Sequence, residues 1–222
     1  VYFHVIAEDK NVEGGWVSDS QISKQMDVLN KGFSDFRITW ELISIDRTIN
    51  KEWFHNVSTA NHELQLAMKK ALRKGGPADL DVYTVGFRSI RTLVGYAILP
   101  WGLKDPDNDG VVIMSSSLPG GTRIKRNLGH TLIHEVGHWG GLYHTFNGGC
   151  SGFGDEVSDT PAQQSAILDC PVGLDTCKND GGPDPLHNYM SSTDDPCTDN
   201  FTPGQISRFK AVLAKYRNVL IG

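Results

Sequence analysis

The stretch from Asn127 to Phe146, NLGHTLIHEVGHWGGLYHTF, decides both the fold and the chemistry that we expect of this chain. It holds the pattern H-E-x-x-H-x-x-G-x-x-H, whose fixed positions are His134, Glu135, His138, Gly141 and His144. A helix has 3.6 residues per turn, so His134 and His138 lie on one face and both imidazoles can reach one metal ion. The opposite face is predicted to pack against a core through Leu128, Leu132, Val136 and Trp139.

The third histidine of the pattern requires a break in this helix. If the helix ran on, His144 would lie about 9 Å beyond His138 along the axis, out of coordination reach. Gly141 solves this problem, because glycine adopts positive φ at little cost and lets the chain turn sharply. Three imidazoles on zinc leave one coordination position open, which is typical of a catalytic site.

Glu135 is the candidate catalytic residue beside this site. Zinc lowers the pKa of a bound water towards ~7 and polarises a carbonyl group. Glu135 can accept the proton of that water and return it to the leaving amine. We therefore predict a zinc hydrolase that cleaves amide bonds with Glu135 as the general base.

Composition and charge exclude several classes of protein. The 222 residues are 39% hydrophobic and 21% charged, which fits a globular chain with one sizeable core. The formal net charge of −5 lacks the basic excess of proteins that bind nucleic acids. No apolar run approaches the ~18 residues of a membrane span, and Val1 does not open a signal-peptide pattern. We predict one domain over 1–222 that binds neither nucleic acid nor membrane, with any targeting segment already removed.

Strand-like and helix-like segments alternate over the first two thirds of the chain. Their apolar spacing predicts strands at 1–7, 36–45, 80–87 and 111–115, and helices at 19–29 and 62–73. A last helix is predicted at 202–220, with Thr202 as N-cap and Pro203 at its first position. Its expected apolar stripe is Ile206, Phe209, Leu213 and Tyr216. This order predicts an α/β fold with a mixed sheet and helices packed on it.

The cysteines lie in the last, loop-rich third of the chain, at Cys150, Cys170, Cys177 and Cys197. An even number of cysteines in such a segment predicts two disulfides. The alternative is a zinc cluster, but the spacings contain no C-x-x-C. Spacing does not choose among the three connectivities that four cysteines allow. Disulfides predict an oxidising compartment, hence a secreted, extracellular protein.

Two further motifs are less specific. Asn56 and Asn200 open N-x-[ST] triplets and are candidate glycosylation sites of a secreted protein. The run from Asp105 to Gly110, DPDNDG, resembles the start of a helix-loop-helix calcium loop. Its twelfth position is Ser116 rather than glutamate and a strand follows, so a plain turn is predicted there.

The long zinc motif followed by Asn188-Tyr189-Met190 resembles the metzincin clan, in which a methionine turn lies beneath the three-histidine site. Other segments look like the pappalysin family, especially its secreted fungal members, over roughly residues 110 to 217. These segments include LPGG at 118–121, Gly149-Cys150, Gly154-Asp155, Asp159-Thr-Pro161, Cys170-Pro171, Asp175-Thr-Cys177 and FTPGQ at 201–205.

The resemblance implies a metzincin-like catalytic domain with two subdomains and substrate lying between them. Residues 1–144 would form the N-terminal part with the zinc helix, and 145–222 an irregular, disulfide-linked part with Met190 and the final helix. It also implies the disulfides Cys150–Cys177 and Cys170–Cys197. Similar proteins bind calcium in the cysteine-rich loop, where the candidate ligands are Asp155, Asp159 and Thr160.

The chain departs from the family pattern at two positions. Ser192 stands where the family commonly has a tyrosine whose hydroxyl assists the tetrahedral intermediate, and losing such a donor typically costs a few kcal/mol. Tyr189 and Tyr143 are nearby in sequence, but nothing in the sequence shows that either replaces it. Gly140 replaces a larger apolar residue, which is expected to loosen the end of the zinc helix by about 1 kcal/mol.

These observations support one leading function and one alternative. The leading hypothesis is a secreted zinc-dependent endopeptidase, a monomer by default, that hydrolyses extracellular protein or peptide substrates. The alternative is a catalytically weakened binding protein that keeps the zinc fold and holds a protein partner in the cleft, a hypothesis supported only by Ser192. The intact Glu135 argues against it, because a retired active site has no need for that carboxylate.

Overall fold

A computed structural model of the chain describes residues 1–179 and 181–221. One sheet is formed by β1 (Tyr2–Ala7), β2 (Ser44–Ile49), β3 (Asp81–Val85), β4 (Gly95–Ala97) and β5 (Val111–Met114), in the order β2-β1-β3-β5-β4. β4 runs antiparallel to β5, and the other neighbouring strands are parallel. The sheet is therefore mixed, as predicted, with β4 as an edge strand.

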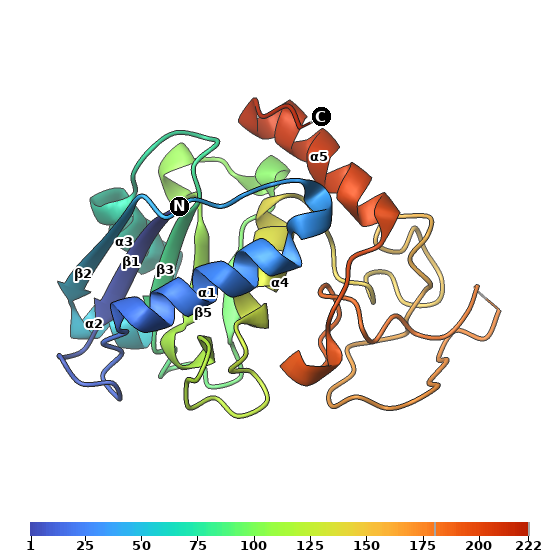
Figure 1. The fold of residues 1–222 in the computed structure, drawn as a ribbon, viewed down its shortest axis with the longest axis horizontal. Coiled ribbons are helices and arrows are strands. Elements are labelled where there is room, and N and C mark those ends of the chain that lie inside the picture. The colour runs from blue at the N-terminus through green and yellow to red at the C-terminus, as the bar shows by residue number, and fades with distance from the viewer. Residues whose placement is uncertain (180, 222) are drawn as a thin grey trace.

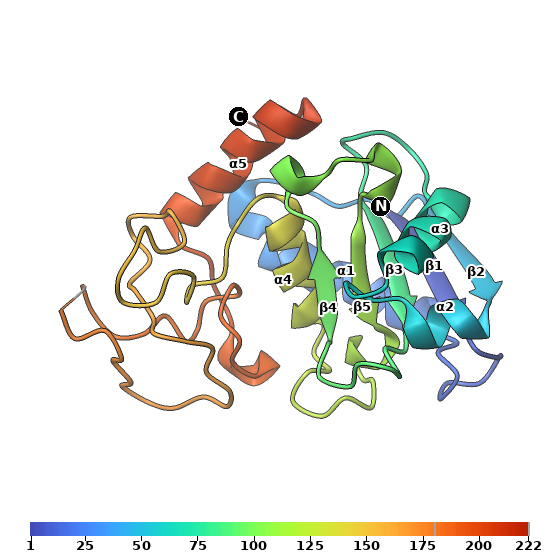
Figure 2. The same cartoon turned by 180° about the vertical axis from the view of Figure 1, so that it is seen from behind.

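Helices cover both faces of this sheet (Figures 1 and 2). The helices on its faces are α1 (Asp19–Gly32), α2 (Lys51–Asn56), α3 (His62–Leu72) and α4 (His130–Trp139), and α5 (Pro203–Arg217) follows near the C-terminal end of the chain. Side chains alternate along β1, so Phe3 and Val5 pack into the core beneath α1 and α4, whereas Ile6 packs into the core beneath α2 and α3. The N-terminal part thus has three layers, helix, sheet and helix.

The predicted helices at 19–29, 62–73 and 202–220 and three of the predicted strands are confirmed to within a few residues. α1 begins after Ser18, whose hydroxyl accepts a hydrogen bond from the Gln21 amide at 3.2 Å. α5 begins after Thr202, which forms a capping box with Gln205, and Pro203 takes the first helical position. Local capping chemistry therefore places these helix starts.

The predicted strand at 36–45 is wrong. Phe36 ends a single turn of 3₁₀ helix, residues 37–43 have no regular structure, and β2 begins only at Ser44. Phe36 and Trp40 are nevertheless buried, because their rings pack among those of Phe33, Trp139, Phe201 and Phe209. The apolar alternation of this segment reflects burial in the main core and not pairing in the sheet.

The segment between α4 and α5 is irregular and is held by disulfides. Apart from a 3₁₀ turn at Asp195–Cys197, its described residues form no helix and only one isolated β-bridge. Cys150 is bonded to Cys177 and Cys170 to Cys197, the pairing that the family resemblance implied. Other single 3₁₀ turns lie at Ser34–Phe36, Pro100–Gly102, Pro106–Asn108 and Ser115–Ser117.

α5 returns the chain to the sheet-bearing part and packs against the main core (Figure 1). Phe209 and Leu213 are buried there as predicted, whereas Tyr216 is 38% exposed. The prediction that Tyr216 belongs to the buried stripe is wrong. At this end of α5 the side chain of the next residue, Arg217, faces the interior. Within the described residues, no helix has the length and apolarity that crossing a bilayer requires.

Candidate metal centre and active site

α4 carries the first two histidines of the motif. The helix begins at His130, directly after Gly129, whose φ of 89° interrupts the helical backbone. Its packed face is formed by Leu132, Val136 and Trp139, each 1% exposed or less. Leu128 was expected on this face, but it precedes the helix and is 43% exposed, so that part of the prediction is wrong.

The turn after α4 brings the third histidine back. Gly141 has φ of 88°, the left-handed conformation predicted for the sharp turn. Its amide donates to the His138 carbonyl and the Leu142 amide donates to the Gly137 carbonyl, both at 2.9 Å. This pair of bonds is a Schellman motif, which ends the helix and reverses the chain towards His144.

The three histidines converge on one point. The Nε2 atoms of His134, His138 and His144 lie 3.0–3.1 Å from one another. Nδ1 of His134 donates to the Tyr189 carbonyl at 2.7 Å, and Nδ1 of His138 donates to the Leu142 carbonyl at 2.8 Å. A carbonyl only accepts, so these contacts place the proton on Nδ1 and leave Nε2 with a free lone pair. The ring of His144 stacks on that of Phe146, with 4.6 Å between centroids.

This arrangement fits a metal ion. Burial lowers the pKa of His138 to about 3, and it also lowers the pKa values of His134 and His144, so all three rings are neutral at neutral pH. The Nε2 lone pairs of His134 and His138 then face each other, and Nε2 of the neutral His144 ring lies 3.0–3.1 Å from both. The spacing of the three Nε2 atoms is close to the ~3.3 Å edge of a tetrahedron with metal–nitrogen bonds of ~2.0 Å, the geometry that zinc prefers.

Glu135 lies beside this centre in an apolar setting. Its side chain is 4% exposed, its Oε2 has no hydrogen-bond partner among the described residues, and burial raises its pKa to about 8. It packs against Gly95 of β4, where an added Cβ would lie 2.8 Å from both Cγ and Oε1 of Glu135. A buried carboxyl oxygen without a partner is costly, and a ligand or water bound in the site could supply the missing donor.

The methionine turn lies beneath α4. Met190 is fully buried, and its sulfur packs against Gly137, where an added Cβ would be 2.4 Å from Sδ. The turn is fixed by Asn188, whose side chain accepts from the Met190 amide at 2.9 Å. The same side chain pairs with that of Gln205 in α5 at 2.7 and 3.0 Å. The turn thereby delivers the Tyr189 carbonyl that orients His134.

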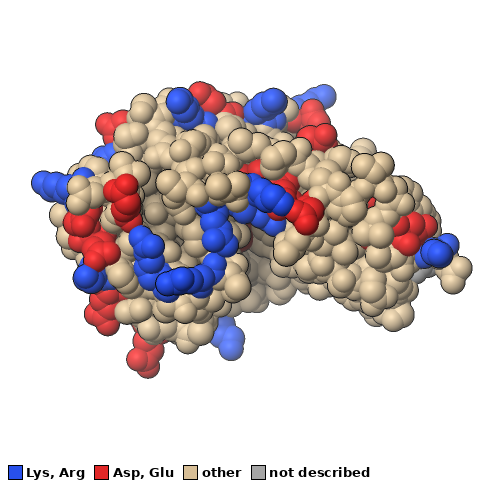
Figure 3. All heavy atoms as spheres, turned by 90° about the horizontal axis from the view of Figure 1, so that it is seen from below, with Lys and Arg blue, Asp and Glu red and all other residues tan. Residues whose placement is uncertain are grey.

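A cleft of about 780 Å³ opens beside the histidines. One wall comes from residues 92–95 at the start of the edge strand β4, and the facing wall comes from the loop at 191–195. Figure 3 shows this side of the molecule hollowed near its middle, with Lys and Arg side chains gathered beside the hollow. The basic residues that line it are Arg123, Lys125 and Arg126.

Three residues of this cleft were missed by the sequence analysis. His130 lines the cleft, and its Nδ1 lies 2.8 Å from Oγ1 of Thr198; its spacing of four from His134 was the available signal. Arg126 holds the facing loop by donating to the carbonyls of Ser192 and, at 2.8 Å, Thr193. No signal in the sequence marks Gly95 or Arg126, because both act through tertiary contacts.

The two tyrosines considered as replacements for the missing family tyrosine lie in different places. Ser192 lines the cleft, but its hydroxyl donates to the Ile167 carbonyl at 3.0 Å. Tyr143 points to another surface, where it contacts Trp101 and Arg208. Tyr189 lines the cleft, and its ring packs edge-on against His130.

The candidate calcium ligands are close in sequence but differ in their contacts. Both oxygens of Asp159 serve the start of α5, accepting from the Thr202 hydroxyl at 2.7 Å and the Gly204 amide at 2.8 Å. Asp155 and Thr160 each have a buried oxygen without a partner in the described structure. Among the residues described, no three His, Cys, Asp or Glu side chains gather there as a metal-binding group. Calcium therefore stays a prediction from the resemblance, and Asp159 is a capping residue of α5.

The remaining sequence motifs lie away from the cleft. Asn56, the last residue of α2, and Asn200 are both exposed, and their glycosylation stays a prediction. The run 105–110 forms the predicted turn, in which Asp105 accepts from the Asp107 amide at 3.0 Å. Cys170, His187 and Cys197 also lie close together, but the two cysteines form a disulfide and cannot ligate a metal as thiolates.

Comparisons with known proteins show which family the chain resembles. Residues 90–214 match the model of a peptidase family described as pregnancy-associated plasma protein-A. An extracellular metalloprotease of Verticillium alfalfae is 45% identical over 222 residues, covering 98% of this chain and 76% of that protein. One from Colletotrichum graminicola is 46% identical, with 98% and 77% covered. The structure of mature mirolysin from Tannerella forsythia in complex with a cleaved peptide has a TM-score of 0.79 and 27% identity, covering 96% of this chain and 90% of that one.

Fold, histidine cluster and relatives together define an extracellular zinc metalloendopeptidase with a metzincin-type fold. More narrowly, the chain belongs to the pregnancy-associated plasma protein-A family, the pappalysins. The predicted fold class, enzyme class and extracellular location are confirmed.

Proposed function

We propose that His134, His138 and His144 bind the catalytic zinc and that Glu135 is the general base in the hydrolysis of peptide bonds. The observation that carries the proposal is the convergence of three neutral imidazoles at 3.0–3.1 Å beside a buried, unpartnered carboxyl oxygen. When bound, zinc would activate water and polarise the substrate carbonyl.

Glu135 is suited to move the proton. Its carboxylate accepts a proton from the attacking water and later donates it to the leaving amine. Burial alone raises the pKa of Glu135 to about 8, and the positive charge of a bound zinc ion would lower it again, so that the carboxylate is ionised and can accept the proton. Gly95 keeps the β4 backbone close to the carboxyl group and so limits where it can lie.

We infer that the substrate is an extended peptide bound in the cleft between the two parts of one catalytic domain, 1–144 and 145–222. β4 is the edge strand of the sheet, and its first residue, Gly95, lines the cleft together with residues 92–94, so a peptide can bind there as an added strand. Such binding relies on the substrate main chain, so it suits protein and peptide substrates in general. We propose that a single chain binds and cleaves the substrate without a partner subunit.

The test is hydrolysis of a quenched peptide library by the purified chain and by Glu135→Gln, with zinc content measured in both. We expect the variant to retain one zinc per chain and to lose kcat by about 10²–10⁴-fold, the usual contribution of a general base. A Glu135→Gln variant that holds zinc and cleaves at the wild-type rate would remove Glu135 from the proposal. Zinc retained by a wild-type chain that cleaves no peptide would favour the binding-protein hypothesis instead.

A further inference from the structure

The turn that ends the zinc helix is covered by α5. An added Cβ at Gly140 would lie 1.9 Å from Cε2 of Phe209, and one at Gly141 would lie 2.7 Å from Cγ1 of Val212. Both contacts are with side chains of α5, so this helix packs directly against the backbone of the turn. Gly140, expected from the sequence only to loosen the helix end, therefore makes room for Phe209.

Two arginines of α5 bind carbonyl oxygens on either side of Gly140. Nε of Arg208 donates to the Gly141 carbonyl at 2.9 Å. Nε and Nη2 of Arg217 donate to the Trp139 carbonyl at 3.2 and 3.0 Å. The Arg217 guanidinium also lies over the Trp139 ring, 3.4 Å from its centroid. α5 thus holds the end of α4 through hydrogen bonds to its backbone as well as through packing.

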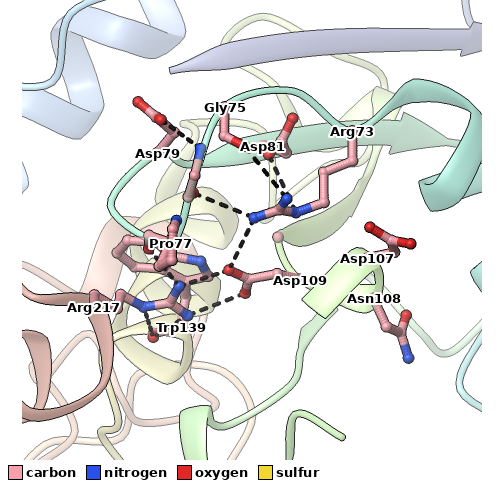
Figure 4. Close-up of polar contacts among 12 residues, drawn as sticks. Arg73, Gly75, Pro77, Asp79, Asp81, Asp107, Asn108, Asp109, Trp139 and Arg217 are labelled. Atoms are coloured by element: carbon pink, nitrogen blue, oxygen red, sulfur yellow. Dashed lines mark hydrogen bonds and ion pairs between the residues drawn. The ribbon is translucent and has the colours of Figure 1, made fainter. Parts of the chain in front are cut away.

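Arg217 is itself held in a buried network. Its Nη1 and Nη2 donate to the two carboxylate oxygens of Asp109 at 2.6 and 3.1 Å, and Nη1 also donates to the Pro77 carbonyl at 3.0 Å (Figure 4). These bonds and the two to Trp139 engage all five N–H groups of the guanidinium. Arg217 and Asp109 are each 3% exposed, so water competes little for these contacts. Since Asp109 lies two residues before β5, the network ties α5 and α4 to the sheet.

The turn that Arg208 and Arg217 bind positions two of the three histidines. The Leu142 carbonyl, next after Gly141, accepts the hydrogen bond that orients His138. His144 follows two residues later, and its Nε2 lies 3.0 Å from that of His138. We propose that Arg208 and Arg217 are positioning residues, which fix the turn through its carbonyl oxygens so that His138 and His144 meet at the metal. The inference rests on the proposed zinc site and adds the device that holds it together.

The test measures how fast zinc passes from the loaded, purified chain to a chromogenic chelator, together with kcat and KM. Arg208→Met keeps the aliphatic stem of the side chain but loses the bond to Gly141, whereas Arg208→Lys keeps one donor. Glu156→Gln is a control for the ion pair of Arg208 with Glu156 at 2.9 Å. Lys215→Met is a matched control that removes one positive charge from an exposed position of the same helix. Arg217→Lys gives up donors to the Trp139 carbonyl but keeps a positive charge facing Asp109. The retained charge makes it less disruptive to folding than a neutral substitution would be.

We expect Arg208→Met and Arg217→Lys to release zinc at least about tenfold faster, in line with the effect of losing partners outside the ligand shell. Their kcat should fall while KM stays near the wild-type value, Arg208→Lys should recover most of the effect, and both controls should behave as wild type. Wild-type rates of zinc release in Arg208→Met and Arg217→Lys would overturn the inference, even if both variants melt earlier. If the variants behave as wild type while the wild-type chain holds zinc and cleaves peptides, the proposed function stands and only this inference is wrong. A wild-type chain that neither holds zinc nor cleaves peptides contradicts both the proposed function and this inference.

Discussion

The sulfur of Met190 packs so tightly against Gly137 that a Cβ on the glycine would lie 2.4 Å from it. Gly137 stands in the middle of α4, where glycine is about 1 kcal/mol less favourable than alanine. The glycine is explained by this contact, because it lets the methionine turn approach α4 between His134 and His138, the two histidines of this helix that we propose as zinc ligands. The close approach also places the Tyr189 carbonyl within 2.7 Å of His134 Nδ1.

Gly137→Ala should therefore destabilise the chain although alanine favours helices. The added methyl group would displace the Met190 turn at a cost of about 1–3 kcal/mol, typical of overpacking, and would disturb the partner of His134. Thermal unfolding and zinc content report the two effects. In a Met190→Ala background the same substitution should cost much less, and an equal cost in both backgrounds would show that the sulfur contact is not the cause.

Gly95→Ala should lower kcat without releasing zinc. The new Cβ would be 2.8 Å from Cγ and Oε1 of Glu135, so the carboxyl group must shift, and misplacing a catalytic group by about 1 Å can cost ~10²-fold in rate. Steady-state kinetics with zinc analysis provides the measurement. Gly102→Ala is the matched control, since its Cβ would meet only Cγ2 of Ile98 at 3.6 Å. Equal kcat for the two variants would argue against a fixed place for Glu135.

Lys69 should make stability depend on pH in the alkaline range. Its side chain is fully buried in α3, its Nζ donates to the carbonyls of Asn108 and Gly110 at 2.9 and 3.3 Å, and burial lowers its pKa from 10.5 to about 7. Between these two pKa values the unfolded chain binds the proton that the folded chain has lost, so the free energy of unfolding rises with pH. Below about pH 7 both states are protonated, and the penalty of the buried charge is present in full.

Lys69→Met removes this titration, so its free energy of unfolding should rise less steeply than that of the wild type from pH 7 to 10. Urea unfolding of both chains, loaded with zinc, at several pH values in this range gives the comparison. The N-terminal amine of Val1, whose pKa is also lowered by burial, contributes equally to both and cancels in the difference. Parallel curves would mean that Lys69 keeps its ordinary pKa.

The two disulfides should have similar effects on stability and different effects on activity. Both join cysteines 27 residues apart, so chain entropy predicts a loss of about 3–4 kcal/mol when either pair is replaced by alanine. Cys197 lies two residues after Asp195, which lines the cleft and accepts from the Leu128 amide at 2.9 Å just before α4. Replacing Cys170 and Cys197 should therefore reduce kcat/KM more than replacing Cys150 and Cys177. The reverse order in a peptide assay would contradict this assignment.

Much of the site could be predicted because its residues are close in sequence. A spacing of four on a helix places His134 and His138 together, and Gly141 explains the turn to His144, so one stretch of chain defines the centre. Gly95 could not be found in this way, because it reaches the site from a distant segment. Arg126 could not be found either, because the carbonyl groups that it binds lie 66 and 67 residues away. The same holds for Arg217, which lies 78 residues from the Trp139 carbonyl that it binds.

The fold could be predicted wherever helix caps and strand alternation act locally, as at Ser18 and Thr202. The prediction failed at 36–45, where Phe36 and Trp40 alternate with polar residues but are buried against side chains from distant parts of the chain. Apolar periodicity reports which side chains are buried and does not reveal where the backbone amides find their partners. At Leu128 the prediction ignored Gly129, whose positive φ keeps the helix from extending further back.

The most direct test of the central claim is removal and return of zinc on one purified sample. The histidine cluster predicts that dialysis against a chelator abolishes peptide hydrolysis as zinc leaves, and that one equivalent of zinc per chain restores it. His144→Ala should fail to recover under the same conditions, because it lacks one of the three converging nitrogens. A chain free of zinc that still cleaves peptides at its original rate would contradict the account.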